Sequence, residues 1–330
     1  MAENENLEGS RPQPSFGLNL FSFAKLESLL GFKREYLRWF AANAGSCYDP
    51  FAARKKSRPF PKKPTSVKLR EIDNPSPELK TIQRAINTNL LRPLEFPIHV
   101  CGGVKGRSVV DNAKLHEGAK VLVTMDIRKF FPSVSSDQIH AVWYKQLNCS
   151  PRISALLTQL TTFERRLPQG APTSTLLANL VLLQAGEQIW KYCEQENIIY
   201  SCWVDDLAFS GPNARTVIQT AIIALRSAGF RVARDKMKIS GPGDRKMLTG
   251  RMLGRVLSLH PQYFAWIRSG IHKLANGLVP GPKVAEYVAS LEAKIKYISS
   301  IVPRKAIKLR EALIAAKMRQ GDPSGARFSN

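Results

Sequence analysis

Two adjacent aspartates, Asp205 and Asp206, lie between two apolar, β-prone segments, residues 198–204 and 207–209. Segments of this kind joined by a short polar link are typical of a β-hairpin, so the two carboxylates are expected at its tip. Like charges on such a tight element are unfavourable unless a cation neutralises them, and a divalent metal ion does so best. An ordinary turn also accommodates Asp-Asp, so the pair alone leaves both interpretations open.

A third carboxylate, Asp126, favours the metal-binding interpretation. It follows an apolar segment, residues 121–125, that predicts a buried strand with a turn and a helix start near Pro132 and Ser133. Carboxylates converging from two β elements can hold two Mg²⁺ ions roughly 3.5–4 Å apart. One such ion lowers the pKa of an attacking 3′-hydroxyl and the other offsets charge on a leaving pyrophosphate, which indicates nucleotidyl transfer.

Between the two acidic elements, residues 166–180 contain a Pro-Gln-Gly-Ala-Pro turn that leads into an apolar helix. Gly170 in this turn lets the backbone approach a ligand closely, where a side chain would collide. The order of motifs resembles the palm of a reverse transcriptase. The motifs are Asp126 with Phe130-Phe131, then Leu-Pro-Gln-Gly at 167–170, then Asp205-Asp206.

Two further signatures narrow the resemblance to retron reverse transcriptases. Asn112-Ala-Lys-Leu-His116 fits the Asn-Ala-x-x-His signature of that group, and Leu248-Thr249-Gly250 is similar to its Val-Thr-Gly signature. The resemblance covers about residues 68–254. It implies that Asn112, His116, Leu248, Thr249 and Gly250 belong to the part that recognises the cognate RNA.

The fold that this resemblance implies is α+β, a right-hand polymerase with fingers, a split βαβ palm and a helical thumb. Residues 1–50 are expected to form an N-terminal helical segment, with helical apolar spacing over 21–42. The fingers would span 51–120 and the palm 121–254, with a finger-like helical insertion at about 137–165. The thumb would span 255–330, with helices over 284–301 and from 307 to 318 after Pro303, and would bind RNA or a duplex.

The resemblance also assigns roles to single residues. Asp126, Asp205 and Asp206 would be catalytic and would ligate Mg²⁺, as two ions, with Mn²⁺ as an alternative. Phe131, five residues after Asp126, would exclude a 2′-hydroxyl, although a core phenylalanine beside Phe130 is the competing interpretation. The other residues expected to bind the nucleotide are Arg70, Lys105, Arg107, Gln169, Gly170 and Lys236.

The chain departs from the family pattern at three places. Trp203-Val204 precedes the aspartate pair where most members have Tyr-Ala, Ala233 replaces an Asn three residues before Lys236, and Leu248 replaces a Val. None of these changes removes a catalytic carboxylate, so activity is expected. The departures bear instead on the primer contact, priming geometry and processivity.

Composition points to a polyanionic partner. The 330 residues carry a formal net charge of +23, which favours nucleic acid or an anionic surface over no polyanion at all. Residues 51–70 contain eight basic residues and no acidic one, interrupted by prolines, and predict a basic loop before a strand. The N-terminus is acidic and no uncharged apolar run approaches the ~20 residues of a membrane span. Five scattered cysteines indicate neither a disulfide framework nor a zinc site, and fit a reducing cytoplasm.

Taken together, the motifs predict an RNA-directed DNA polymerase that uses dNTPs to copy a cognate structured non-coding RNA, which serves as template and primer. As the resemblance implies, the product would be RNA-linked single-stranded DNA, made in a bacterial antiphage defence system with an effector or toxin protein as a further partner. One alternative is another defence-associated or group II intron-like reverse transcriptase. The intron form is disfavoured because no maturase or endonuclease extension is expected. The other alternative, a catalytically silent RNA-binding scaffold for a toxin, does not explain three converging carboxylates.

Overall fold

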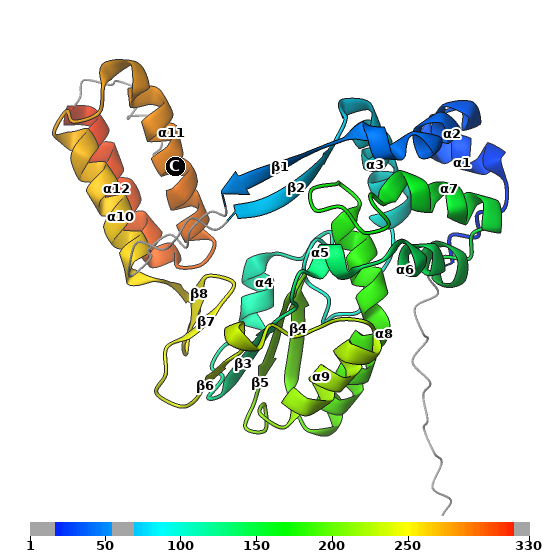
Figure 1. Ribbon diagram of the computed structural model, residues 1–330. Coiled ribbons are helices and arrows are strands. Elements are labelled where there is room, and N and C mark those ends of the chain that lie inside the picture. Colours follow the sequence, from blue (N-terminus) through cyan, green and yellow to red (C-terminus); the bar gives the residue numbers. More distant parts are fainter. Residues whose placement is uncertain (1–16, 55–68, 320–330) are drawn as a thin grey trace, which may run out of the picture.

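The computed structural model describes residues 17–54 and 69–319. A four-stranded sheet with flanking helices forms the centre, a β-hairpin and a group of helices lie on one side of it, and a three-helix bundle forms the C-terminal part (Figure 1). The architecture therefore mixes helices and antiparallel sheet, as predicted.

The central sheet has the strand order β4-β5-β3-β6. Its strands are β3 (Leu122–Asp126), β4 (Ile199–Trp203), β5 (Asp206–Ser210) and β6 (Lys238–Ser240). Every neighbouring pair is antiparallel. Strands β3 and β4 therefore run parallel with β5 between them, and β5 and β6 run parallel with β3 between them. These two interleaved units have the split βαβ connectivity.

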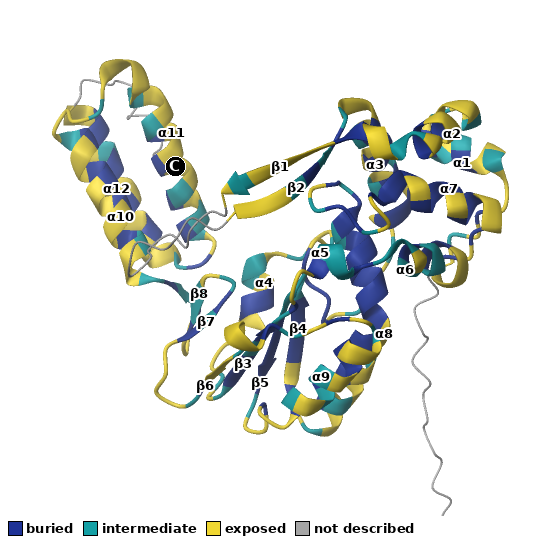
Figure 2. Ribbon diagram, in the orientation of Figure 1, coloured by how far each residue is buried: buried dark blue, intermediate teal, exposed yellow. Residues whose placement is uncertain are grey.

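The two faces of the sheet belong to different hydrophobic clusters because successive side chains alternate between faces. Val123 and Phe209 pack in the larger cluster, together with helices α8 (Ser174–Gln195) and α9 (Val217–Ser227). Leu122 and Ala208 pack instead in a second cluster that includes Ala113 of α4 (Val109–Lys114) and the apolar residues of the C-terminal bundle. The sheet thus joins both cores of the molecule (Figure 2).

The N-terminal helices are α1 (Phe23–Leu30) and α2 (Arg34–Ala42). The sequence predicts helical spacing across 21–42, but Gly31 adopts φ 75° and ends α1, because a left-handed residue stops the right-handed helix. The two helices pack with α3 (Pro77–Ile86) and α7 (Pro151–Thr161). The expected helical insertion at 137–165 consists of α6 (Ser136–Ala141), η3 (Val142–Gln146) and α7.

Strands β1 (Tyr48–Arg54) and β2 (Leu69–Pro75) form an antiparallel hairpin that pairs Tyr48 with Pro75 and Arg54 with Leu69. In the view of Figure 1 the hairpin extends toward the C-terminal bundle, and most of its outer half is exposed (Figure 2). Most of the basic loop expected between residues 51 and 70 lies outside the described residues.

The C-terminal part begins with a small sheet of β7 (Lys246–Leu248), β8 (Arg251–Leu253) and β9 (Ser258–Leu259). Three helices follow, α10 (Pro261–Ala275), α11 (Val284–Ser299) and α12 (Pro303–Arg319). The sequence predicts the last two helices at these positions, whereas α10 was not predicted. The helices pack on one another through buried residues such as Ile267, Leu291 and Leu313.

The remaining short elements are η1 (Ala44–Cys47), η2 (Asn87–Leu91), α5 (Phe130–Ser133), η4 (Arg234–Lys236) and η5 (Gly281–Lys283). Across residues 17–54 and 69–319, no helix combines the length and the apolar character needed to cross a membrane.

Candidate catalytic site

Three aspartates lie at one end of the central sheet. Asp126 ends β3 and pairs in register with Asp206, the first residue of β5. Trp203 and Asp206 close the β4–β5 hairpin, so that Val204 and Asp205 form its two-residue link. The carbonyl of Asp205 accepts a hydrogen bond from the backbone N–H of Ile127 at 2.9 Å. The strand-end and hairpin positions predicted from the sequence are thus brought together.

The link that carries Asp205 is strained. Val204 has φ 60°, a conformation that is a true outlier for a β-branched residue and persists only where its surroundings impose it. Here those surroundings include a segment beside β4. The N–H of Cys202 donates to the carbonyl of His99 at 2.7 Å, and the N–H of Cys101 donates to the carbonyl of Cys202 at 2.8 Å.

Gly102 lies directly against this link. A Cβ atom on Gly102 would be 2.4 Å from the nitrogen of Val204 and 2.9 Å from the carbonyl carbon of Trp203. The carbonyl of Gly102 also accepts a hydrogen bond from the amide of Asn179, in the helix that follows the Pro-Gln-Gly turn, at 2.8 Å. Only glycine fits at position 102. The sequence did not single out Gly102 or Asn179, and the Gly102-Gly103 pair was the only signal for the close approach.

The site is electrostatically negative and partly desolvated. Burial, followed by the charge of Asp126, raises the pKa of Asp205, while the cations Lys236 and Arg70 act in the opposite direction. The ammonium group of Lys236 forms an ion pair with the carboxylate of Asp126. Arg70, at the exposed end of β2, is thus close enough to influence Asp205, although it is 135 positions distant in the chain.

The donor chemistry fits a divalent metal ion. Three carboxylates offer the hard oxygen ligands that Mg²⁺ and Mn²⁺ prefer, and Asp126 already holds one cationic group, that of Lys236. In the described part of the chain, no three His, Cys, Asp or Glu side chains are already arranged to hold a metal ion. Metal binding at Asp126 would therefore compete with Lys236.

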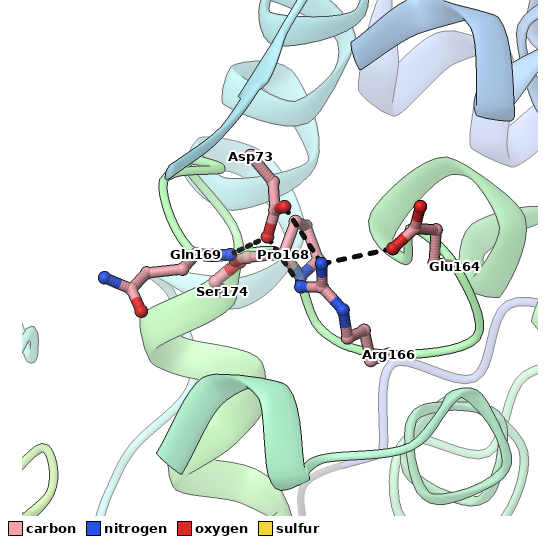
Figure 3. A network of polar contacts seen from close by, with 6 residues as sticks. All are labelled: Asp73, Glu164, Arg166, Pro168, Gln169 and Ser174. Carbon is pink, nitrogen blue, oxygen red and sulfur yellow. Dashed lines mark hydrogen bonds and ion pairs between the residues drawn. The ribbon is translucent and has the colours of Figure 1, made fainter. Parts of the chain in front are cut away.

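The Pro-Gln-Gly turn is docked on strand β2. Two hydrogen bonds join Asp73 and Gln169. The backbone N–H of Asp73 donates to the carbonyl of Gln169 at 2.9 Å, and the side-chain carboxylate of Asp73 accepts from the backbone N–H of Gln169 at 2.9 Å. The side chain of Gln169 points away from this network (Figure 3). Gly170 has φ 129°, and a Cβ there would lie 3.0 Å from Ile72, which explains the glycine.

Phe131 is half-buried at the start of α5, and its ring lies 5.5 Å from that of the buried Phe130. Partial exposure leaves one side of the ring available for a ligand, whereas Phe130 belongs to the core. Lys105 is exposed, in a loop before α4.

Arg107, which the sequence predicts to bind the nucleotide, is engaged within its own loop. Its guanidinium group donates to the carbonyls of Phe96 at 2.6 Å, Pro97 and Val100. These bonds use three of the five guanidinium donors and hold the segment from Phe96 to Val100. Nucleotide binding by Arg107 stays a prediction.

Two residues of the retron signature are buried in the protein interior. His116 is fully buried, and its two ring nitrogens contact the hydroxyls of Ser210 at 2.7 Å and Ser201 at 2.8 Å. Burial lowers the pKa of His116 to about 4, so the ring is neutral at pH 7. Asn112 is 1% exposed. These two residues therefore support the fold around the sheet, and the link between the signature and the RNA stays a prediction.

The Leu248-Thr249-Gly250 signature forms the turn between β7 and β8. Leu248 is buried, while Thr249 and Gly250 have φ 47° and 82°. Two left-handed residues in succession make a type I′ hairpin link. Its role is therefore at least partly to close the small sheet.

The family is identified by sequence comparison as well as by this geometry. Residues 60–257 match the family model described as reverse transcriptase (RNA-dependent DNA polymerase). The chain is 30% identical over 220 residues to the retron Ec86 reverse transcriptase of Escherichia coli, covering 66% of this chain and 68% of that one. It is 27% identical over 199 residues to the retron Se72 reverse transcriptase of Salmonella heidelberg, covering 60% of this chain and 50% of the relative.

A third relative, the retron Mx162 reverse transcriptase of Myxococcus xanthus, is 29% identical over 324 residues, covering 87% of this chain and 65% of that one. The chain thus spans between half and about two thirds of the length of these relatives. It belongs to the reverse transcriptase family, and within that family to the retron type.

Proposed function

We propose that this protein is an RNA-directed DNA polymerase that copies a cognate structured non-coding RNA into RNA-linked single-stranded DNA, using the RNA as template and primer. The observation that carries the proposal is the meeting of Asp126, Asp205 and Asp206 at one end of adjacent strands. By its connectivity the central sheet corresponds to a palm, the β1–β2 hairpin to part of the fingers, and the α10–α12 bundle to a thumb.

The three carboxylates would hold two Mg²⁺ ions, which when bound lower the pKa of the attacking hydroxyl and offset charge on the leaving pyrophosphate. Burial and the charge of Asp126 raise the pKa of Asp205, so a bound cation would stabilise its ionised form. Lys236, which pairs with Asp126, would be released toward the pyrophosphate and would donate a proton to it.

Residues around the carboxylates would select the substrate. Phe131 would lie beneath the sugar and reject a 2′-hydroxyl by steric exclusion. Gln169 and Gly170 would line the incoming nucleotide, and Arg70 and Lys105 would contact its triphosphate or the template backbone. Arg70 is supported by its electrostatic influence on Asp205.

The RNA would lie along the basic C-terminal bundle. A groove between α10 and α11 is lined by Trp266, Lys273, Tyr287 and Lys294 among others. The ammonium of Lys294 lies 4.5 Å from the centroid of the Trp266 ring. An aromatic face beside two lysines suits an unpaired base and its phosphate.

The biological setting that we propose is a bacterial antiphage defence system in which an effector or toxin protein accompanies the polymerase and its RNA. A defence-associated reverse transcriptase without a dedicated RNA remains the neighbouring candidate, and the nature of the bound RNA separates the two. A catalytically silent scaffold is disfavoured because partly buried carboxylates that repel one another, such as Asp205 and Asp126, would serve no purpose in it.

The assignment of the carboxylates is tested by Asp205→Asn. Removing this charge eliminates a metal ligand but relieves repulsion with Asp126, so DNA synthesis should be lost while the melting temperature of the metal-free protein stays equal or rises. The measurement is Mg²⁺-dependent dNTP incorporation on a primed RNA template beside a melting curve. Asp235→Asn, an exposed carboxylate paired with Arg128, is the matched control. Wild-type incorporation by Asp205→Asn would refute the metal site.

A further inference from the structure

Asp73 is a buried carboxylate in strand β2, whose first three residues, 69–71, are exposed. It is 2% exposed, and both its oxygens are engaged. The guanidinium of Arg166 donates to them at 2.7 and 3.1 Å, and the backbone N–H of Gln169 donates at 2.9 Å (Figure 3). A buried carboxylate is stable only when it is paired and hydrogen-bonded in this way.

Arg166 has two acidic partners of unequal character. Asp73 is buried, whereas Glu164, at 3.3 Å, has a side chain that is 63% exposed. The hydrogen bond with Asp73 is the main reason that the pKa of Arg166 is raised. Bidentate pairing to a buried carboxylate fixes orientation as well as distance, whereas an exposed pair contributes little.

The ion pair joins two elements that are distant in sequence. Asp73 lies three positions after Arg70 on β2, and Arg166 lies three positions before Gln169 in the Pro-Gln-Gly turn. The turn is fixed on its other side by the hydroxyl of Ser174, which donates to the carbonyl of Pro168 at 2.6 Å (Figure 3). The only covalent route between β2 and the turn is the long chain from residue 75 to 166.

We propose that Asp73, through Arg166 and the N–H of Gln169, is a positioning residue for the incoming nucleotide. It sets the place of the Gln169 turn relative to the hairpin that carries Arg70, and touches no substrate itself. This inference rests on the proposed nucleotide-binding roles of Gln169 and Arg70. Nothing in the sequence motifs indicates it, because an isolated aspartate in a strand has no signature.

The test is single-turnover incorporation of one dNTP on a DNA primer annealed to an RNA template, with the dNTP concentration varied. Asp73→Asn should raise the half-saturating dNTP concentration by about tenfold or more while the maximal rate falls less, because misplaced binding groups act first on binding. Glu164→Gln, which removes the exposed partner of the same arginine, should leave both quantities unchanged.

Two more variants keep the test decisive if Asp73→Asn folds poorly. Arg166→Lys keeps the charge but loses the two-pronged contact, so it should raise the half-saturating dNTP concentration with little loss of melting temperature. In the double variant Asp73→Asn/Arg166→Gln no buried charge is left unpaired, since the remaining Glu164 is exposed, and the effect should be smaller than the sum of the single effects.

The variants distinguish a wrong role for Asp73 from a wrong assignment of the nucleotide site. If Gln169→Ala and Arg70→Ala raise the half-saturating dNTP concentration but Asp73→Asn and Arg166→Lys change only the melting temperature, the ion pair is merely structural and the inference is overturned. If Gln169→Ala and Arg70→Ala change nothing, the proposed nucleotide site is wrong and the inference falls with it.

Discussion

The charge state of Asp205 that the proposed chemistry needs is the one that the folded protein disfavours. Its ionised form is disfavoured in the folded protein by burial and by Asp126, yet this is the form that would ligate a metal ion in the proposed site. The strained Val204 beside it adds a second local cost. Such costs persist where function requires the geometry, and they are balanced by the surrounding core.

Phe131 provides the sharpest prediction for a single side chain. Replacing it with Val should admit ribonucleotides, because discrimination would rest on a steric clash with one hydroxyl and not on a lost attraction. The ratio of dNTP to rNTP incorporation efficiency should fall by about tenfold or more. Paired single-nucleotide kinetics measure it, and an unchanged ratio would return Phe131 to a packing role.

At this scale the sequence predicted the motif residues well and their surroundings poorly. The aspartates are recognisable because metal chemistry requires particular residue types at strand ends. The contacts that Arg107 makes within its own loop were not predicted, because its partners are backbone carbonyls, which leave no mark in sequence. Asp73 was missed because its burial depends on a fold in which strand β2 meets a turn 96 positions away.

Among the elements, the segment that follows α4 is attached to the central sheet by a neutral histidine, in addition to the apolar packing of α4 itself. His116 bridges Ser201 of β4 and Ser210 of β5, and these serines share the sheet face that α4 covers. A buried bridge of this kind must stay unprotonated to remain buried. The retron signature therefore has a structural role in this chain.

This arrangement predicts a pH dependence of stability. The pKa of His116 is lowered from 6.5 to about 4, so between these values the unfolded chain binds a proton that the folded chain does not. The contribution of neutral His116 to the free energy of unfolding is fully present above pH 6.5 and is lost as pH falls toward 4, on the order of 3 kcal/mol in all.

Urea unfolding of wild type and His116→Gln at pH 7 and pH 5 measures this contribution. The variant should be less stable at pH 7 and less sensitive to the change. Equal pH sensitivity of the two proteins would contradict it.

The segment beside β4 provides another prediction for an element. Gly102→Ala places a Cβ against Val204, so the link that carries Asp205 must shift. Because the shift moves Asp205, it should lower the maximal polymerisation rate by about 100-fold. The added Cβ should also lower the free energy of unfolding by about 1–3 kcal/mol. Gly45→Ala, where nothing lies within 4 Å of the added atom, is the control. Equal activity of the two variants would show that the link tolerates movement.

Elements were predictable where periodicity was strong. Strand β3, the β4–β5 hairpin and helices α11 and α12 lie where apolar patterning predicts them. The break at Gly31 and the helix α10 were missed because a left-handed glycine and a mixed polar helix depend on packing partners. The order of the strands in the central sheet depends on contacts between distant segments. It was therefore predicted only through the family resemblance.

On the scale of the whole molecule, a net charge of +23 dominates. Each phosphate that the protein neutralises releases condensed counterions, so affinity for RNA should fall steeply as salt rises. The charge explains why a polyanion binds, whereas the choice of one RNA requires shape and base contacts. Composition therefore predicted the class of partner and could not identify it.

The proposed function requires that the polymerase copies a dedicated RNA. The most direct measurement is extraction of nucleic acid at moderate salt from wild type and Asp205→Asn, each purified from the native host. We expect one dominant RNA species in both preparations, with covalently attached DNA in the wild type alone. Part of the wild-type material should resist DNase and part should resist RNase. Heterogeneous cellular RNA without linked DNA in the wild type would refute the proposed function.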